Sequence, residues 1–151
     1  MTDDIKLVVR GIDRLTSAIC RFRLGAADGR PLPLFTAGAH IKVKVALPDG
    51  RADERSYSLV NSDGQNGDYE IAVQCESAGQ GGSAYMHRLK GGDALAARGP
   101  VNDFRLATGA SHHVLIAGGI GITPILSMAR ALRAAGQPFD LHYAARSPEL
   151  M

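Results

Sequence analysis

The sequence contains few cysteines, little net charge and no long hydrophobic run. Cys20 and Cys75 are its two cysteines, and neither has a second Cys or His at ligand spacing. A structural zinc site or an iron–sulfur cluster needs about four such ligands, so neither is expected within this chain. We therefore expect two reduced thiols in a cytoplasmic protein that holds no metal of its own.

Charge and hydropathy exclude two further classes of partner. The formal net charge is +2, with Lys and Arg spread along the chain, which gives no electrostatic case for nucleic acid or an anionic membrane. The longest apolar run, residues 114–122 (VLIAGGIGI), is too short to span a bilayer and is interrupted by glycines. The first residues are acidic, unlike a secretory signal. We therefore expect this chain to bind neither nucleic acid nor a membrane.

Glycine is abundant, with 18 residues that gather at 79–82, 91–92 and 118–121 and predict specific loops. Residues 5 to about 106 read as short strands separated by turns, and the segment GGSAYMHRLKGGD reads as one short helix closed by glycines. This pattern predicts a closed or nearly closed antiparallel β-barrel. The expected strands are 5–14, 17–26, 41–46, 54–60, 69–75 and 93–100.

The periodicity changes near residue 108. A short apolar run (SHHVLIAGG) predicts a buried parallel strand, and TPILSMARALRAAGQ predicts an amphipathic helix before a second strand, PFDLHYAARS. Thr123 is the expected N-cap of that helix, Pro124 its first residue and Gly136 its end. Strand, helix and strand form the opening unit of a doubly wound α/β sheet.

Two domains are therefore predicted, residues 1–107 and residues 108–151. A single βαβ unit leaves a two-stranded parallel sheet poorly covered, so we expect the second domain to be the first part of a larger, truncated one. Exchange of this unit with a partner chain, or its packing against the barrel, is the alternative.

The stretch ERSYSLVNS places Arg55 and Tyr57 on one face of a strand, because successive side chains alternate. A rim tyrosine and a solvated arginine would explain that pattern alone. However, a glycine run directly precedes the helix that is expected to begin near Ser83, and such a loop can bind phosphate. The guanidinium of an arginine can bind a phosphate through two parallel hydrogen bonds, and a tyrosine ring can stack on a flat heteroaromatic group. The combination predicts a site for a phosphorylated planar cofactor.

Three motifs carry a family resemblance: RSYS at 55–58, GGS at 81–83 and GGIGITP at 118–124. In order and spacing they resemble the ferredoxin–NADP reductase superfamily, and more narrowly the reductase components of aromatic-ring oxygenases of the phthalate dioxygenase reductase and vanillate demethylase reductase type. The resemblance implies a flavin-binding Greek-key barrel. It implies a flavin with its phosphate on Arg55, its isoalloxazine ring on Tyr57 and its N5 near Ser58. The implied phosphate loop is Gly81, Gly82 and Ser83.

The resemblance also implies FMN as the flavin, with FAD in the wider superfamily as the alternative. The GQGGS loop followed by His87 is similar to the FMN version. We expect that histidine at the surface of the short helix, with contact to the flavin phosphate as the alternative. Two positions depart from the family: Gln74 and Val101 stand where a basic residue is expected, so weaker flavin binding is predicted.

The GGIGITP loop is not GxGxxG, because Pro124 occupies the third glycine position. By itself it predicts a tight strand-to-helix turn. The resemblance implies that Gly119 and Gly121 meet the pyrophosphate of NADH or NADPH and that Thr123 lies by the nicotinamide or the flavin edge.

The implied function is electron transfer from NAD(P)H through flavin to a [2Fe–2S] centre, which would lie in a missing C-terminal domain or a partner such as a terminal oxygenase. The sequence shows no paired-carboxylate or nucleophile pattern, and hydride transfer requires none. Ser58 and Thr123 are the candidate catalytic residues. The alternatives are a non-catalytic or flavin-free assembly module and an FAD-type ferredoxin reductase.

Overall fold

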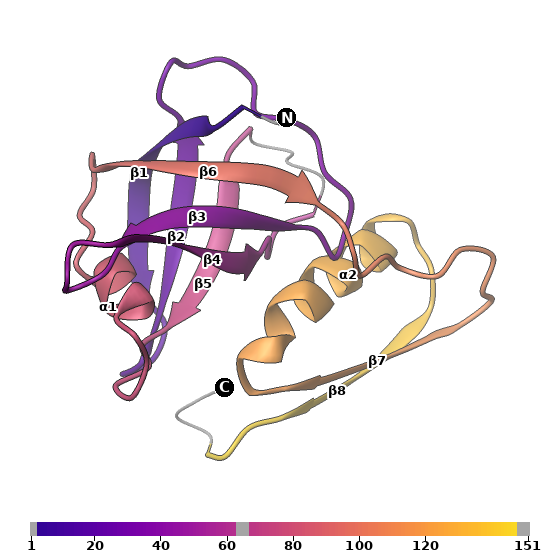
Figure 1. Ribbon diagram of the computed structural model, residues 1–151. Helices are drawn as coiled ribbons and strands as arrows, with labels where there is room; N and C mark the ends of the chain where they lie inside the picture. The colour runs from indigo at the N-terminus through magenta and orange to yellow at the C-terminus, as the bar shows by residue number, and fades with distance from the viewer. Residues whose placement is uncertain (1–2, 63–66, 148–151) are drawn as a thin grey trace.

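Six antiparallel strands form a barrel in the computed structural model, which describes residues 3–62 and 67–147 (Figure 1). Along the sheet the strand order is β4-β3-β6-β1-β2-β5, a Greek-key arrangement that confirms the predicted barrel. The short helix α1 (Gly82–His87) lies at one end of it. The strands are β1 (Ile5–Arg14), β2 (Ile19–Ala26), β3 (His40–Ala46), β4 (Ala52–Ser58), β5 (Tyr69–Gln74) and β6 (Ala94–Val101).

Alternation along the strands fills the barrel. On β3 the side chains of Ile41 and Val43 are fully buried, and their partners in the ladder with β4 are Tyr57 and Arg55. Directly paired residues share a face, so Arg55 and Tyr57 lie on the interior side of the edge strand β4. Barrel closure brings this edge next to the other edge strand, β5 (Figure 1).

The segment after β4 closes the barrel. Val60 donates its N–H to the carbonyl oxygen of Glu70 on β5 at 2.8 Å. Asn61 then uses its side chain twice: Nδ2 donates to the carbonyl oxygen of Asp68 at 3.0 Å, and Oδ1 accepts the N–H of Glu70 at 3.1 Å. These bonds satisfy backbone groups that an open sheet edge would leave unpaired.

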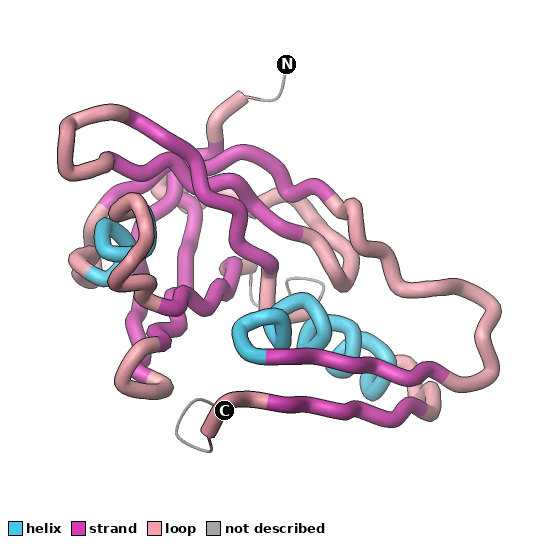
Figure 2. The backbone as a smooth tube through the Cα atoms, turned by 60° about the horizontal axis from the view of Figure 1, so that its bottom comes forward, coloured by secondary structure: helices cyan, strands magenta, loops and turns pink. Residues whose placement is uncertain are grey.

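A βαβ unit follows the barrel: β7 (His113–Gly118), the 3₁₀ turn η1 (Gly119–Gly121), α2 (Ile122–Ala134) and β8 (Phe139–Ala144), with β7 and β8 parallel. Helix α2 lies alongside one face of this two-stranded sheet (Figure 2). On the opposite face Val114 and Ile116 are 58% and 71% exposed. The expectation of a buried strand is therefore wrong for one face of β7, because among the described residues α2 covers the other face alone.

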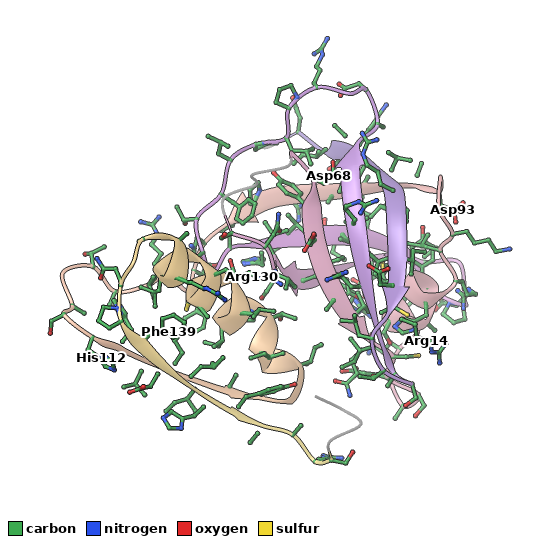
Figure 3. All side chains as sticks on the ribbon, turned by 180° about the vertical axis from the view of Figure 1, so that it is seen from behind. Arg14, Asp68, Asp93, His112, Arg130 and Phe139 are labelled. Atoms are coloured by element: carbon green, nitrogen blue, oxygen red, sulfur yellow. The ribbon has the colours of Figure 1, made fainter. Side chains whose placement is uncertain are left out.

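Helix α2 also packs against the barrel. The buried Ser127 donates its hydroxyl to the carbonyl oxygen of Asn61 at 2.8 Å, and Arg130 donates to the carbonyl oxygen of Val60 at 3.1 Å. Figure 3 shows Arg130 where α2 approaches the barrel. Helix α2 thus contacts the barrel, while the outer face of β7 stays exposed.

The start of α2 differs from the prediction. The helix begins at Ile122 with Gly121 as N-cap, so Thr123 is its second residue and Pro124 its third. Instead of capping, the Thr123 hydroxyl donates to the carbonyl oxygen of Ile120 at 3.1 Å. The cause is η1, which continues directly into α2 and places the helix start before the Thr-Pro pair. Gly136, with φ 68°, does follow its end.

None of the helices that the structure describes is long and apolar enough to cross a membrane. Within residues 3–62 and 67–147, no group of three or more His, Cys, Asp or Glu side chains is placed to hold a metal ion.

Candidate functional site

Arg55 and Tyr57 open into one cavity together with the start of α1. Its volume is about 190 Å³, and it lies between β4, the end of β5 and the loop that leads to α1. Thus strand alternation aims the arginine and the tyrosine, and barrel closure brings the glycine-rich loop to them. The lining residues are Arg55, Ser56, Tyr57, Gln74, Glu76, Gly79, Gln80, Gly82 and Ser83.

The side chain of Arg55 passes directly over Gly82, the first residue of α1. A Cβ atom built on Gly82 would lie 2.6 Å from Nε of Arg55 and 2.9 Å from its Cγ. These distances are shorter than a van der Waals contact, so the absent side chain is what lets the guanidinium lie against the backbone of α1. The site therefore brings a fixed positive charge to the first backbone amides of the helix.

Asp53 holds the other side of that guanidinium. Nη1 of Arg55 donates to Oδ2 of Asp53 at 2.5 Å and to the carbonyl oxygen of Glu54 at 2.9 Å. The hydrogen bond from Arg55, with a further one from the N–H of Glu54, lowers the pKa of Asp53. Sequence reasoning missed this residue. Its position two residues before Arg55 places it on the same strand face, which is the signal that would have found it.

Tyr57 presents a neutral ring to the cavity. Burial raises the pKa of its hydroxyl to about 12, Arg55 opposes that shift, and Glu76 adds to it. The ring therefore stays uncharged at neutral pH, and its face remains available to a planar group.

Ser83 is the second residue of α1 and not its N-cap. The N-cap of α1 is Gly81, whose φ of 103° favours glycine and whose Cα faces the ring of Pro48. The Ser83 hydroxyl accepts the N–H of Glu76 at 3.0 Å, so it fixes the loop between β5 and α1. Its own hydrogen remains free to donate.

Ser58 lies on the opposite face of β4 from Tyr57. It borders a second cavity, of about 280 Å³, together with His40, its partner in the β3–β4 ladder, and with Asp103. Ser56 borders both cavities, so the two adjoin. Neither His40 nor Asp103 stands out in the sequence, because only the ladder register and the end of β6 bring them to Ser58.

His87 does not line the first cavity, so the alternative of a contact with the phosphate is wrong, and its side chain is half-buried instead of lying at the surface. Its Nε2 donates to the carbonyl oxygen of Val73 at 2.8 Å, and its ring meets the Phe22 ring edge-on, with centroids 6.4 Å apart. The side chain therefore points from α1 into the barrel wall.

Gly119, Gly121 and Thr123 lie on the second unit, where η1 packs beside β5. Both glycines are exposed, and Gly119 has φ 54°, a left-handed conformation in which glycine is preferred. Thr123 is 8% exposed, with its hydroxyl directed to Ile120. The structure thus places the glycine turn η1 near β5. The hydroxyl of Thr123 points to the carbonyl oxygen of Ile120.

The barrel residues match a known protein family. The profile of the family described as "Oxidoreductase FAD-binding domain" matches residues 6–106, which is more than half of the chain. The chain belongs to this family. It is therefore a flavin-binding oxidoreductase domain, and the predicted family is confirmed.

Relatives are similar over nearly the whole chain. Tetrachlorobenzoquinone reductase of Sphingobium chlorophenolicum is 45% identical over 148 residues, which cover 97% of this chain and 44% of that protein. Phthalate dioxygenase reductase of Burkholderia cepacia is 42% identical over 147 residues, which cover 96% of this chain and 44% of that protein. The chain spans less than half the length of these curated relatives.

Solved structures agree on the fold. A phthalate dioxygenase reductase, described as a modular structure for electron transfer from pyridine nucleotides to [2Fe–2S], matches with a TM-score of 0.88 and 41% identity, over 98% of this chain and 46% of that one. The ferredoxin–NADP⁺ reductase of Plasmodium falciparum, at 17% identity, matches with a TM-score of 0.80 over 98% of this chain and 61% of that one, and it shows the shared fold alone.

The residues of the first cavity fit the phosphate end of a flavin. A guanidinium, a serine hydroxyl and the backbone at the start of α1 converge where a Cβ on Gly82 would fill the space. Such a set of donors suits a phosphate.

Proposed function

We propose that this chain is the flavin-binding part of a reductase that passes electrons from NADH or NADPH through the flavin to a [2Fe–2S] centre, which serves an aromatic-ring oxygenase. One observation carries the proposal: Arg55, Tyr57, Gly82 and Ser83 line one cavity in a domain of the FAD-binding family. The names of the relatives support the electron-transfer role. The [2Fe–2S] centre would belong to another domain or to a partner.

The residues divide the work of holding the flavin. Arg55 binds the phosphate with the N–H groups that Asp53 and Glu54 leave available, and Gly81, Gly82 and Ser83 supply the loop around it. Tyr57 lies along the isoalloxazine ring. When bound, the flavin supplies hydride acceptance and single-electron transfer.

We propose that two residues with hydroxyl groups, Ser58 and Thr123, lie where the flavin and the nicotinamide meet. Ser58 offers a hydrogen bond near N5 from the second cavity, which adjoins the first at Ser56. Thr123 lies by the nicotinamide, with its hydroxyl bonded to Ile120 and its methyl group left for contact. Gly119 and Gly121 meet the pyrophosphate of NAD(P)H, which their exposure supports.

We propose residues 1–107 as the flavin domain and residues 108–151 as nucleotide-binding. Separate apolar clusters support the division: one fills the barrel, and the other joins α2 to β7 and β8. FMN is the proposed flavin and FAD the alternative, since the resemblance to phthalate dioxygenase reductases favours FMN.

Cofactor identity tests the proposal directly. The purified protein, reconstituted with a mixture of FMN and FAD, would be washed and heated, and the released flavin identified by mass. Release of FMN is the expected result, and release of FAD would select the alternative cofactor. Recovery of neither flavin would contradict the proposal and favour a flavin-free assembly module.

Arg55→Ala tests the phosphate contact. Losing a hydrogen bond to a charged group should weaken flavin binding by about 1.5–3 kcal/mol, measured by flavin fluorescence titration. The matched control is Arg51→Ala on the same hairpin, because Arg51 pairs with Asp49 and its side chain is 73% exposed. Equal affinities for the Arg55 variant and the parent would show that the phosphate is held elsewhere.

A further inference from the structure

Acidic side chains outnumber basic ones around the first cavity, where the phosphate is proposed to bind. Arg55 is the guanidinium in its lining, and Glu76 contributes a carboxylate. A second carboxylate, Asp53, lies 2.5 Å from the same guanidinium. One positive side chain is therefore accompanied by two negative ones: Glu76 in the cavity lining, and Asp53, which binds the guanidinium from outside the lining.

The other elements around the cavity do not restore the balance. Tyr57 is neutral, and α1 directs Gly82 and Ser83 toward the cavity, with no acidic residue in its first turn. The charged end of α1 lies elsewhere: His87 bonds to Val73, and Arg88 borders a separate cavity with Asp93. Arg51 is close enough to Asp53 to help lower its pKa, but it is itself paired with Asp49.

A phosphate monoester such as that of FMN loses its second proton near pH 6, whereas each phosphate of a diester or pyrophosphate carries one charge. Two carboxylates repel a doubly charged phosphate more strongly than a singly charged one. Asp53 also accepts a hydrogen bond from Nη1 of Arg55. The guanidinium therefore has one donor fewer to offer the second negative charge of a phosphate.

We propose that Asp53 and Glu76 are specificity-determining residues that make this site select a singly charged phosphate. FMN then binds best as the monoanion, and its affinity falls as its phosphate loses the second proton. FAD, whose phosphates do not titrate in this range, keeps its affinity. This inference rests on the proposed function, because it concerns the flavin phosphate site.

Fluorescence titrations of riboflavin, FMN and FAD from pH 5.5 to 7.5 at constant ionic strength test it. Riboflavin has no phosphate and corrects for any effect of pH on the protein or the ring site. The affinity ratio of FMN to riboflavin should fall about tenfold across this range, and the ratio of FAD to riboflavin less than about twofold.

The variants Asp53→Asn and Glu76→Gln should each raise FMN affinity at pH 7.5 about three- to fivefold and flatten its pH dependence. Asp49→Asn, which removes a carboxylate that pairs with Arg51 and not with Arg55, should leave both unchanged. Thermal unfolding of each variant checks that the fold is retained.

Failure of the inference and failure of the proposed function give different results. FMN binding that is independent of pH, or weaker FMN binding in both variants, would overturn the charge selection while leaving the flavin site in place. Weaker binding would mean that Asp53 serves to orient Arg55. If none of the three flavins binds, the proposed function fails and the charge selection fails with it.

Discussion

Arg55 crosses the start of α1 at a residue that has no side chain, and this makes Gly82 a sensitive position. An added methyl group would lie 2.6 Å from Nε of Arg55, and the flexible arginine side chain would have to move away. Alanine is otherwise favoured over glycine in a helix by about 1 kcal/mol. Gly82→Ala should therefore weaken flavin binding about tenfold or more while thermal stability is unchanged or higher.

The control for this variant is Gly91→Ala, because a Cβ at Gly91 would meet no atom within 4 Å. Flavin titration and thermal unfolding of both variants separate a binding effect from a folding effect. Unaltered flavin affinity in Gly82→Ala would show that the position of Arg55 against α1 does not matter for binding.

Tyr69 predicts an alkaline limit to stability. It is 1% exposed, donates its hydroxyl to the carbonyl oxygen of Pro33 at 2.5 Å, and burial raises its pKa to about 12. An unfolded tyrosine ionises near pH 10, so above that pH the unfolded state loses a proton that the folded state keeps. Stability is thus fully present below about pH 10, and it should fall by about 1.4 kcal/mol per pH unit between about pH 10 and 12.

Urea unfolding at pH 8, 10 and 11 measures this slope. Tyr57, whose pKa is also raised to about 12, should add to it in the same direction. Tyr69→Phe removes the titrating group, so it should reduce the slope even though it loses the hydrogen bond at pH 8. A slope that Tyr69→Phe leaves unchanged would contradict the assignment.

Strand alternation is the part of the site that the sequence predicts well at this scale. It places Arg55 and Tyr57 on one face, and the structure shows them facing one cavity. The same rule extends to Asp53. By contrast, the bonds of Ser83 to Glu76 and of His87 to Val73 depend on backbone groups of another element, and no local pattern reveals them.

Among the elements, α2 shows both the strength and the limit of local signals. Its amphipathic pattern and Gly136 predict a helix with the right end, but the Thr-Pro pair predicts the wrong start. The 3₁₀ turn before it is built by Gly119 in a left-handed conformation, and that turn brings the helix start forward to Ile122. The same apolar pattern does not show which residues of α2 meet the barrel.

Ser127 is the polar anchor between the two units. It is fully buried, and its hydroxyl bonds to a carbonyl oxygen 66 residues away in the sequence. Ser127→Ala leaves the Asn61 carbonyl without this donor, which should lower the free energy of unfolding by about 1–3 kcal/mol. Denaturant unfolding measures the change, with the exposed Ser111→Ala as control. A loss below about 0.5 kcal/mol, typical of surface substitutions, would contradict a stabilising anchor.

For the molecule as a whole, the sequence predicts the order of barrel and βαβ unit, but not how the second unit is covered. A continuous apolar run such as that of β7 is typical of strands buried on both faces, yet Ile116 is 71% exposed. Burial depends on which partners pack against the sheet, and the run itself carries no information about them. The two apolar clusters are therefore expected to differ in stability, since one fills a six-stranded barrel and the other covers one face of two strands.

A pair of methionines tests whether the clusters open independently. Met86 is fully buried in the barrel, and Met128 is 3% exposed in the second cluster, where its Cε also lies against Gly38 of the barrel. Truncation of a buried methionine to alanine typically costs about 2–5 kcal/mol.

Met128→Ala should accelerate amide hydrogen exchange in β7 and β8 while β1 and β2 keep their protection, because local opening is set by the contacts of each cooperative unit. Met86→Ala, the same chemical change in the barrel, should accelerate exchange in β1 and β2. If each variant accelerates exchange equally in all strands, the chain unfolds as one unit, and the proposed division at residues 107 and 108 is wrong. If the responses separate, the flavin cavity, which the barrel strands and α1 build, keeps its shape while the glycine turn before α2 moves.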